Sequence, residues 1–400
     1  MAFIALLSAR EGPGAATTGA PIEFGGQPLV EFQARMAIAA GVEHILIQSE
    51  AASPDLLQMN DRLMTERQVS VALARDMLSI SRSLAPTDII LIMAENMLIP
   101  AEVIASLAGQ EAPALIALPA VPATSAFERI DADAMWAGAL LLTGDAVLGT
   151  LDMLGEWDLG LTLLRRAVQL EARRILLSPE LVMDGRLVLL RDQGAADAAL
   201  EVLAEQDQAL AGREGGGLRR LLAPVARPLV RELVRRQIEP VALMMMALLV
   251  GIAGLALGFS AFSVPAVLLG LGALGLCDVA GQCAQITLRP AASPMRRYAV
   301  DGLVVATLAL IGWRVSNGEI LAFSAVCMAL FLSVMIPFVP DRDDPAVGLW
   351  APWLQINIPV ALLIVLAGLL LGVGDIGFAL LGLLALVVVT LRLAPKRPRV

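Results

Sequence analysis

The chain has 400 residues, of which 58% are hydrophobic and 17% are charged, with a mean hydropathy of +0.75 and a formal net charge of −9. This apolar content excludes an ordinary soluble protein and predicts a membrane-embedded part. The acidic charge lies in residues 1–237, which carry 20 arginines and 30 acidic side chains, so nucleic acid is not an expected partner. His44 is the single histidine of the sequence, which excludes His-based zinc sites and Ser-His triads.

Residues 1–211 alternate between short apolar runs and helical segments. Strands are predicted at 3–8, 45–47, 89–93, 114–119, 138–143 and 187–191, and helices at 28–40, 54–84 and 158–171. Continuous apolar runs are typical of parallel strands that are buried on both faces. The alternation therefore predicts a Rossmann-like α/β domain with a mainly parallel sheet.

A linker, Gly212 to Gly217, is followed by an amphipathic segment that extends to residue 239. Its apolar positions fall on one helical face. Its other face carries six arginines: Arg219, Arg220, Arg227, Arg231, Arg235 and Arg236. This pattern favours a helix that lies on an anionic membrane surface, and the alternative is a helix packed on the soluble domain.

Residues 240–400 contain apolar runs that are long enough to cross a bilayer. Six transmembrane helices are predicted, near 241–263, 265–287, 298–314, 320–339, 353–373 and 376–394. Basic residues gather before the first helix, between the second and third, and in the tail, where Lys396 is the only lysine of the chain. The positive-inside rule then places both termini in the cytoplasm, as in a multi-pass protein of a bacterial-type inner membrane.

Two aspartates in the predicted spans are candidates for function, because ionisable groups in a membrane are costly. Asp278 lies near the inner end of the second span, and Asp301 near the start of the third. Arg289, Arg296 and Arg297 lie between them. Such a set suits Mg²⁺ and a phosphate group, and the alternative is a pair of capping or helix-linking aspartates.

Six spans, a juxtamembrane amphipathic helix and polar residues on spans two and three resemble the CDP-alcohol phosphotransferase family. That resemblance implies transfer of a phospho-alcohol from a CDP donor to an acceptor alcohol at a metal site of four aspartates. Residues 277–285 read CDVAGQCAQ, so Cys277 and Ala280 stand where the first two aspartates belong. Asp278 and Asp301 are each one residue out of register with the family signature.

The first 200 residues resemble the sugar-phosphate nucleotidyltransferases. The resemblance rests on the strand FIALLS, a glycine-rich loop after it, and the run GGQPLVEFQARMAIAAGVEHILI from Gly25. It implies a loop that binds triphosphate through Arg10, Gly12 and Gly14, and a Mg²⁺ ligand at Glu95. Ile22 stands where the family has a lysine. The pair Trp157–Asp158 is a candidate for a second acid.

The two halves together resemble bifunctional enzymes that make CDP-inositol and then a phosphodiester of inositol. The expected function is that of a divergent membrane-bound transferase of phospholipid or phospho-alcohol metabolism, with CTP or a CDP-alcohol as ligand. The alternative is an inactive pseudoenzyme that acts as a scaffold or regulator of a membrane lipid or polysaccharide pathway. Membrane lipids and a second copy of the chain, in a homodimer, are the expected partners.

Overall fold

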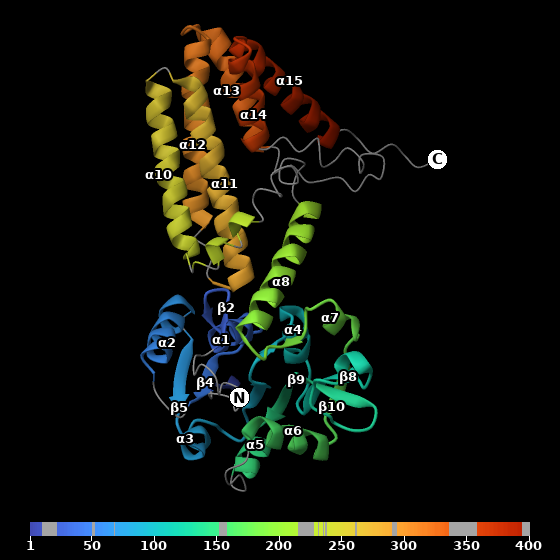
Figure 1. Cartoon of the computed structure of the whole chain (residues 1–400). Helices are drawn as coiled ribbons and strands as arrows, with labels where there is room; N and C mark the ends of the chain where they lie inside the picture. The colour runs from blue at the N-terminus through green and yellow to red at the C-terminus, as the bar shows by residue number, and fades with distance from the viewer. Residues whose placement is uncertain are drawn as a thin grey trace, which may run out of the picture. The chain divides into compact units, whose positions relative to one another are not determined.

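The computed structural model describes residues 1–9, 22–49, 53–67, 69–151, 158–214, 228–230, 232–234, 236, 238–260, 262–289, 294–335 and 358–393. The chain divides into two compact units (Figure 1). The first comprises Met1–Ala204 with Ile286–Arg289, and the second comprises Glu205–Gln285 with Pro290–Val400. The first break falls within helix α8 (Gln193–Glu214), which continues three residues into the predicted linker.

A seven-stranded sheet forms the centre of the first unit, in the order β10-β8-β9-β6-β1-β4-β5. All neighbouring strands pair in parallel except β9, which is antiparallel to β6 and β8. The mainly parallel α/β sheet predicted from the sequence is therefore confirmed. The strands are β1 (Phe3–Ser8), β4 (His44–Gln48), β5 (Ser70–Ala74), β6 (Ile89–Met93), β8 (Ala114–Pro119), β9 (Ala134–Thr143) and β10 (Arg173–Leu176).

Helices cover both faces of this sheet (Figure 1). Alternate residues of β1 show the two faces: Ala5 and Leu7 belong to one apolar core, and Ile4 and Leu6 to the other. The first core is covered mainly by α1 (Leu29–Ala39), α2 (Pro54–Arg67), α4 (Ala101–Ala108) and the start of α8. The second is covered by α3 (Met77–Arg82), α5 (Gly144–Leu151) and α6 (Leu159–Gln169).

The structure differs from the predicted elements at three places. The helix expected at 54–84 is α2, strand β5 and α3 in succession, and α3 begins where the Asp76 carboxylate accepts a hydrogen bond from Ser79 N. The run at 187–191 contains β11 (Val188–Leu189), which pairs with β7 (Met97–Leu98) outside the main sheet. The edge strand β10 was not predicted, because two of its four residues are arginines. The remaining short elements are β2 (Glu23–Phe24), β3 (Gln27–Pro28), the turn η1 (Pro122–Thr124) and α7 (Glu180–Met183).

A network of buried charges joins α1 to α2. The Arg35 guanidinium donates to Glu31 at 2.6 Å and to Glu66 at 2.5 Å, and Arg62 donates to the second oxygen of Glu31 at 2.7 Å. Glu31 and Arg35 are buried. Mutual pairing is what makes such burial tolerable, since an unpaired charge in the interior is costly.

The described part of the second unit contains six helices after residue 239, one in each stretch predicted to span a membrane. These are α10 (Pro240–Phe259), α11 (Ser263–Thr287), α12 (Pro294–Val315), α13 (Ile320–Met335), α14 (Ile358–Leu370) and α15 (Gly374–Leu393). Helices α10, α11 and α12 are long and apolar enough to cross a membrane, whereas the apolar segments of the other three are shorter, among the residues described. Membrane association is thus supported, and the count of six crossings stays a prediction. The predicted amphipathic helix at 218–236 lies mostly outside the described residues.

Candidate functional site

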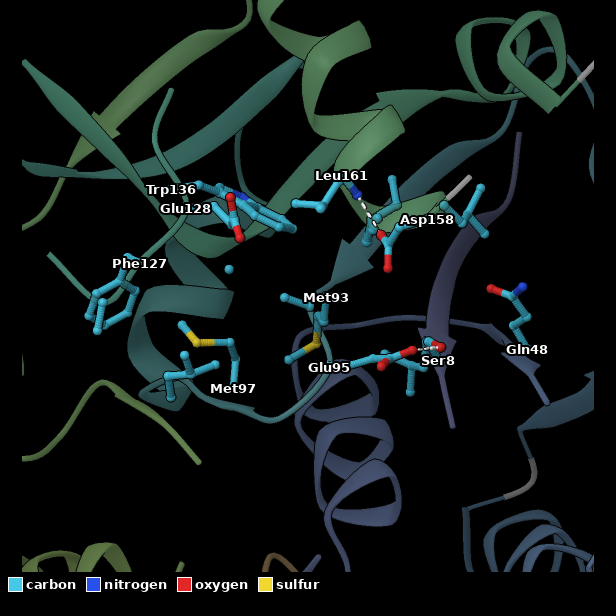
Figure 2. A pocket seen from close by; sticks show the side chains of 18 residues that line it. Ser8, Gln48, Met93, Glu95, Met97, Phe127, Glu128, Trp136, Asp158 and Leu161 are labelled. Carbon is cyan, nitrogen blue, oxygen red and sulfur yellow. Dashed lines mark hydrogen bonds between the residues drawn. The ribbon is translucent and has the colours of Figure 1, made fainter. Parts of the chain in front are cut away.

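A pocket of about 230 Å³ opens at one edge of the sheet of the α/β unit (Figure 2). Strands β1, β4 and β6 end there, at Ser8, Gln48 and Met93. Strand β1 lies between β4 and β6. The strand order reverses at β1, because β4 and β5 are added on one side of it and β6 on the other. Open α/β sheets bind their ligands outside the carboxyl ends of the strands, at such a reversal of strand order.

Glu95 lies at the tip of a tight turn that follows β6. The next residue, Asn96, has a φ of 53°, a left-handed conformation that asparagine tolerates better than most residues. The buried side chain of Gln33 holds the turn, because its Nε2 donates to Ala94 O and to Met97 O, both at 2.9 Å. Ser8 Oγ donates to a carboxylate oxygen of Glu95 (Figure 2). Glu95 is therefore directed toward the end of β1 by contacts on both sides.

Gly138 of β9 fits closely against the same turn. Its carbonyl accepts a hydrogen bond from Ala94 N at 2.7 Å, and its φ of 90° is one that L side chains rarely adopt. A Cβ at this position would lie 2.8 Å from Cε of Met97. Only glycine accommodates both the backbone conformation and the close approach, so β9 and the turn after β6 define one wall of the pocket together.

Trp136 and Phe127 supply an aromatic wall to the pocket. Trp136 is buried, and its Nε1 donates to Ala139 O at 3.1 Å, which fixes the orientation of the indole. Its backbone N donates to Glu128 O at 2.7 Å. This bond brings Glu128 beside Trp136, and Figure 2 shows the carboxylate next to the indole. The side chain of Glu128 is exposed to solvent.

Asp158 is a further carboxylate of the pocket, at the start of α6. Its Oδ1 accepts a hydrogen bond from Leu161 N at 2.8 Å and so caps the helix (Figure 2). The sequence predicts Asp158 as a possible second acid beside Trp157, and the structure does place Asp158 in the pocket. Trp157 lies outside the described residues.

Gln48 is a polar residue of the pocket that the sequence does not single out. Its side chain is only 6% exposed and, among the residues described, receives no hydrogen bond and donates none. In the parallel pairing of β1 with β4, Gln48 lies opposite Ser8, so the two side chains point to the same side of the sheet. The amide lines the pocket at the end of β4 and is therefore a candidate ligand contact.

Charge in the pocket is one-sided. Its described lining includes the carboxylates of Glu95, Glu128 and Asp158 and includes no lysine or arginine. Across the described parts of both units, no three or more His, Cys, Asp or Glu side chains are grouped to hold a metal ion. The described lining alone is therefore not arranged to bind a metal through protein ligands only.

The other predicted site residues fall in three places. Arg10, Gly12 and Gly14 lie outside the described residues, so the phosphate-binding loop stays a prediction. On the helical unit, Arg297 Nη2 lies 3.6 Å from Asp278 Oδ1, Asp301 is half-buried on α12, and Arg296 is exposed. Arg289, predicted to bind phosphate, donates from Nη2 to Gly26 O at 3.0 Å, and both residues belong to the first unit.

Comparison with known proteins gives matches among the solved structures only. No protein-family model matches the sequence, and no curated protein matches it. One solved structure, a 4-diphosphocytidyl-2C-methyl-D-erythritol synthase, is similar to 44% of this chain over 88% of its own length, with 16% identity and a TM-score of 0.31. A similarity this weak carries no argument, so the site is interpreted from its own geometry.

Proposed function

We propose that the chain is a membrane-bound transferase of phospholipid or phospho-alcohol metabolism, and that its α/β unit binds an alcohol or its activated form in the pocket at the end of β1. The observation that supports this proposal most is the position of the pocket. It lies where the strand order of a mainly parallel sheet reverses, and this is where such sheets bind nucleotides and related ligands.

Glu95 is the residue we assign to Mg²⁺ in this unit. Mg²⁺ is usually held by one or two carboxylates together with the phosphates of its substrate, and not by a full set of protein ligands. A single carboxylate aimed into the pocket suits that mode of binding. The ion would supply charge neutralisation for a leaving pyrophosphate. Arg10, Gly12 and Gly14 are the residues we expect to contact the phosphates of CTP or of a CDP-alcohol.

In the helical unit we assign a second phosphate-binding role to Asp278, Asp301, Arg296 and Arg297, and Arg289 of the first unit is a separate candidate for phosphate binding. Support comes from the ion pair of Arg297 with Asp278 and from the half-buried position of Asp301 on α12. The carboxylate can bind Mg²⁺, and the nearby guanidinium can donate hydrogen bonds to the oxygens of a phosphate that is bound to this ion. Membrane lipids are the acceptors that this proposal favours, and a bacterial-type inner membrane and a homodimer are part of it.

Pyrophosphate and CMP release test this function directly. Full-length protein in lipid nanodiscs, given Mg²⁺, CTP and a phospho-alcohol, should release pyrophosphate, and CDP-alcohol with lipid should release CMP. Glu95→Gln should lower pyrophosphate release at least ~tenfold, because it removes a carboxylate that offsets phosphate charge. Glu111→Gln, at an exposed position outside the pocket, is the matched control. Unchanged turnover in Glu95→Gln, or in Asp278→Ala with Asp301→Ala, would remove the corresponding assignment.

The alternative function, an inactive scaffold or regulator, is favoured by one specific observation. A polyphosphate needs positive charge, and the described pocket lining carries three carboxylates and no lysine or arginine. The same nanodisc preparation separates the two functions. A scaffold should show no change of melting temperature with Mg²⁺–CTP and no product, yet should co-purify with another membrane enzyme.

A further inference from the structure

The described lining of the pocket in the α/β unit is rich in hydrogen-bond acceptors and contains no lysine or arginine, and this selects its ligand. We infer that it binds a small amino alcohol, with the ammonium group beside Trp136 and Glu128 and the hydroxyl group toward Ser8 and Gln48. Binding of such a compound is inferred from the pocket itself. Only its assignment as the alcohol that becomes activated rests on the proposed function.

Glu128 and Asp158 favour a cation in the pocket. Both line it, from different segments of the chain, and the described lining offers neither a lysine nor an arginine to balance them. Their carboxylates are not part of any metal-binding group among the described residues. An organic cation is attracted by both carboxylates and does not have to be coordinated by either.

Trp136 and Phe127 provide the surface on which such a cation is stabilised. An ammonium group near the face of an indole gains a cation–π attraction, and tryptophan is the strongest of the aromatic side chains in this role. The hydrogen bond from Trp136 Nε1 to Ala139 O holds the indole in place, so this side chain loses little conformational freedom when a ligand binds. Figure 2 shows Glu128 next to this ring, so a cation there meets a carboxylate and an aromatic surface together.

Gln48 and Ser8 provide the polar end that a hydroxyl group requires. The buried Gln48 amide has both a donor and an acceptor and lies opposite Ser8 across the β1–β4 pairing. A ligand hydroxyl can accept from one and donate to the other. The pocket volume of about 230 Å³ is below the ~300–1,000 Å³ of sites for drug-sized ligands. A molecule of a few heavy atoms is therefore the size that fits.

Calorimetric titration of the full-length protein in nanodiscs tests this inference, with choline, ethanolamine, glycerol and 3,3-dimethylbutan-1-ol as probes. The last compound has the shape of choline without its charge. We expect choline or ethanolamine to bind at least ~tenfold more tightly than the neutral isostere and glycerol, because only the cations interact with the carboxylates and the indole. Added salt should weaken the binding of the cations and leave the isostere unaffected.

Glu128→Gln keeps the shape of an exposed side chain and removes its charge, so the fold is not at risk. It should weaken cation binding about three- to tenfold, and Glu111→Gln, at an exposed site outside the pocket, should not. Three results would each overturn the inference: equal affinities for choline and its isostere, no binding of either cation, or a cation affinity of Glu128→Gln equal to that of the wild type.

Two separate measurements distinguish this inference from the proposed function. Pyrophosphate release from Mg²⁺–CTP without cation binding would leave the proposed function in place and end the inference. Cation binding without any effect of nucleotide on melting temperature or turnover would support the inference and contradict the proposed function.

Discussion

In the α/β unit, Glu31 and Arg35 are almost completely buried, whereas in the helical unit large apolar side chains such as Leu249 and Phe259 are each 64% exposed. Buried charges are tolerated only when they are paired. Large apolar side chains are exposed without cost where they contact lipid, and the membrane-length helices α10, α11 and α12 favour such contact for the helical unit. Burial alone therefore does not identify function in this chain; the surroundings of each charge do.

The ionisable groups of the two units differ accordingly. Glu31 and Arg35 are paired on every side and belong to the fold, while Glu128 is exposed in a pocket and belongs to no ion pair described. In the helical unit, the half-buried Asp278 lies 3.6 Å from the exposed Arg297. Among the residues that we assign to function, Glu128 is one whose charge the described fold does not require.

The largest effect is expected from Glu31→Ala. It leaves Arg35 and Arg62 without their shared buried partner, which should cost about 3–5 kcal/mol of the free energy of unfolding. Glu232→Ala removes a partner from an exposed pair with Arg236, where the loss should stay below about 1 kcal/mol. Melting temperatures of both full-length variants in nanodiscs measure the difference. Similar shifts for the two variants would contradict the role of burial in this comparison.

A charge placed on the exposed surface of α10 should have the next largest effect. Leu249→Arg puts a guanidinium at a position that we expect to face lipid, with a cost of about 2.5–3 kcal/mol near the membrane centre. Leu78, which is 57% exposed in the α/β unit, tolerates the same change within about 0.5 kcal/mol, because it faces water. The readout is the fraction of each variant that remains in alkali-washed membranes. If Leu249→Arg is retained like the wild type, this face of α10 does not contact lipid.

Burial of a strand on both faces decides whether it could be predicted from the sequence. Strands β1, β6 and β8 are continuous apolar runs because helices cover both of their faces, so the sequence pattern is enough to predict them. Strands β5 and β10 lie at the two edges of the sheet, where partial exposure admits serine and arginine. Their sequences carry little of the pattern that predicts a buried strand.

The candidate site could be predicted only in part. Glu95 follows a recognisable strand and Asp158 precedes a recognisable helix, and the resemblance to the sugar-phosphate nucleotidyltransferases is what implies a role for each. Strand register brings Gln48 to the pocket, and pairing of a loop with β9 brings Glu128 and Trp136 there. Neither of these long-range contacts can be recognised in the local sequence. A glutamine that ends a buried apolar strand, as Gln48 does, is the one signal that was available.

Helices α14 and α15 of the helical unit pack closely at glycines. A Cβ on Gly368 of α14 would lie 3.0 Å from Cα of Gly377 and 3.2 Å from Val373 O, so backbone blocks it. Gly368→Ala should therefore destabilise the packing of α14 on α15 by about 1–3 kcal/mol. Gly275→Ala on α11, where no atom lies within 4 Å of the new methyl group, is the control. Thermal unfolding in nanodiscs should separate the two; equal melting temperatures would mean that α14 and α15 adjust freely.

The smallest effect concerns Asp88, a buried carboxylate that is satisfied by backbone alone. It accepts hydrogen bonds from Ala2 N and Ala85 N, both at 2.9 Å, and these bonds hold the pKa of Asp88 below its ordinary value. A carboxyl whose pKa is lowered on folding stabilises the folded state above its unfolded pKa of about 3.9 and loses this contribution as the pH falls through the folded value. Asp88→Asn should cost about 1–2 kcal/mol at neutral pH, because one charged acceptor becomes a neutral one.

The pH profile of that cost distinguishes charge from shape. Between pH 7 and 5 the difference in melting temperature between wild type and Asp88→Asn should be constant, and below about pH 4 it should narrow as Asp88 takes up a proton. Asp133→Asn, at an exposed position of the same unit, should show no such narrowing. If the difference in melting temperature stays unchanged at the lowest pH, Asp88 stabilises the fold through its shape and not through its charge. The pairing of buried charge would then not explain the stability of this carboxylate.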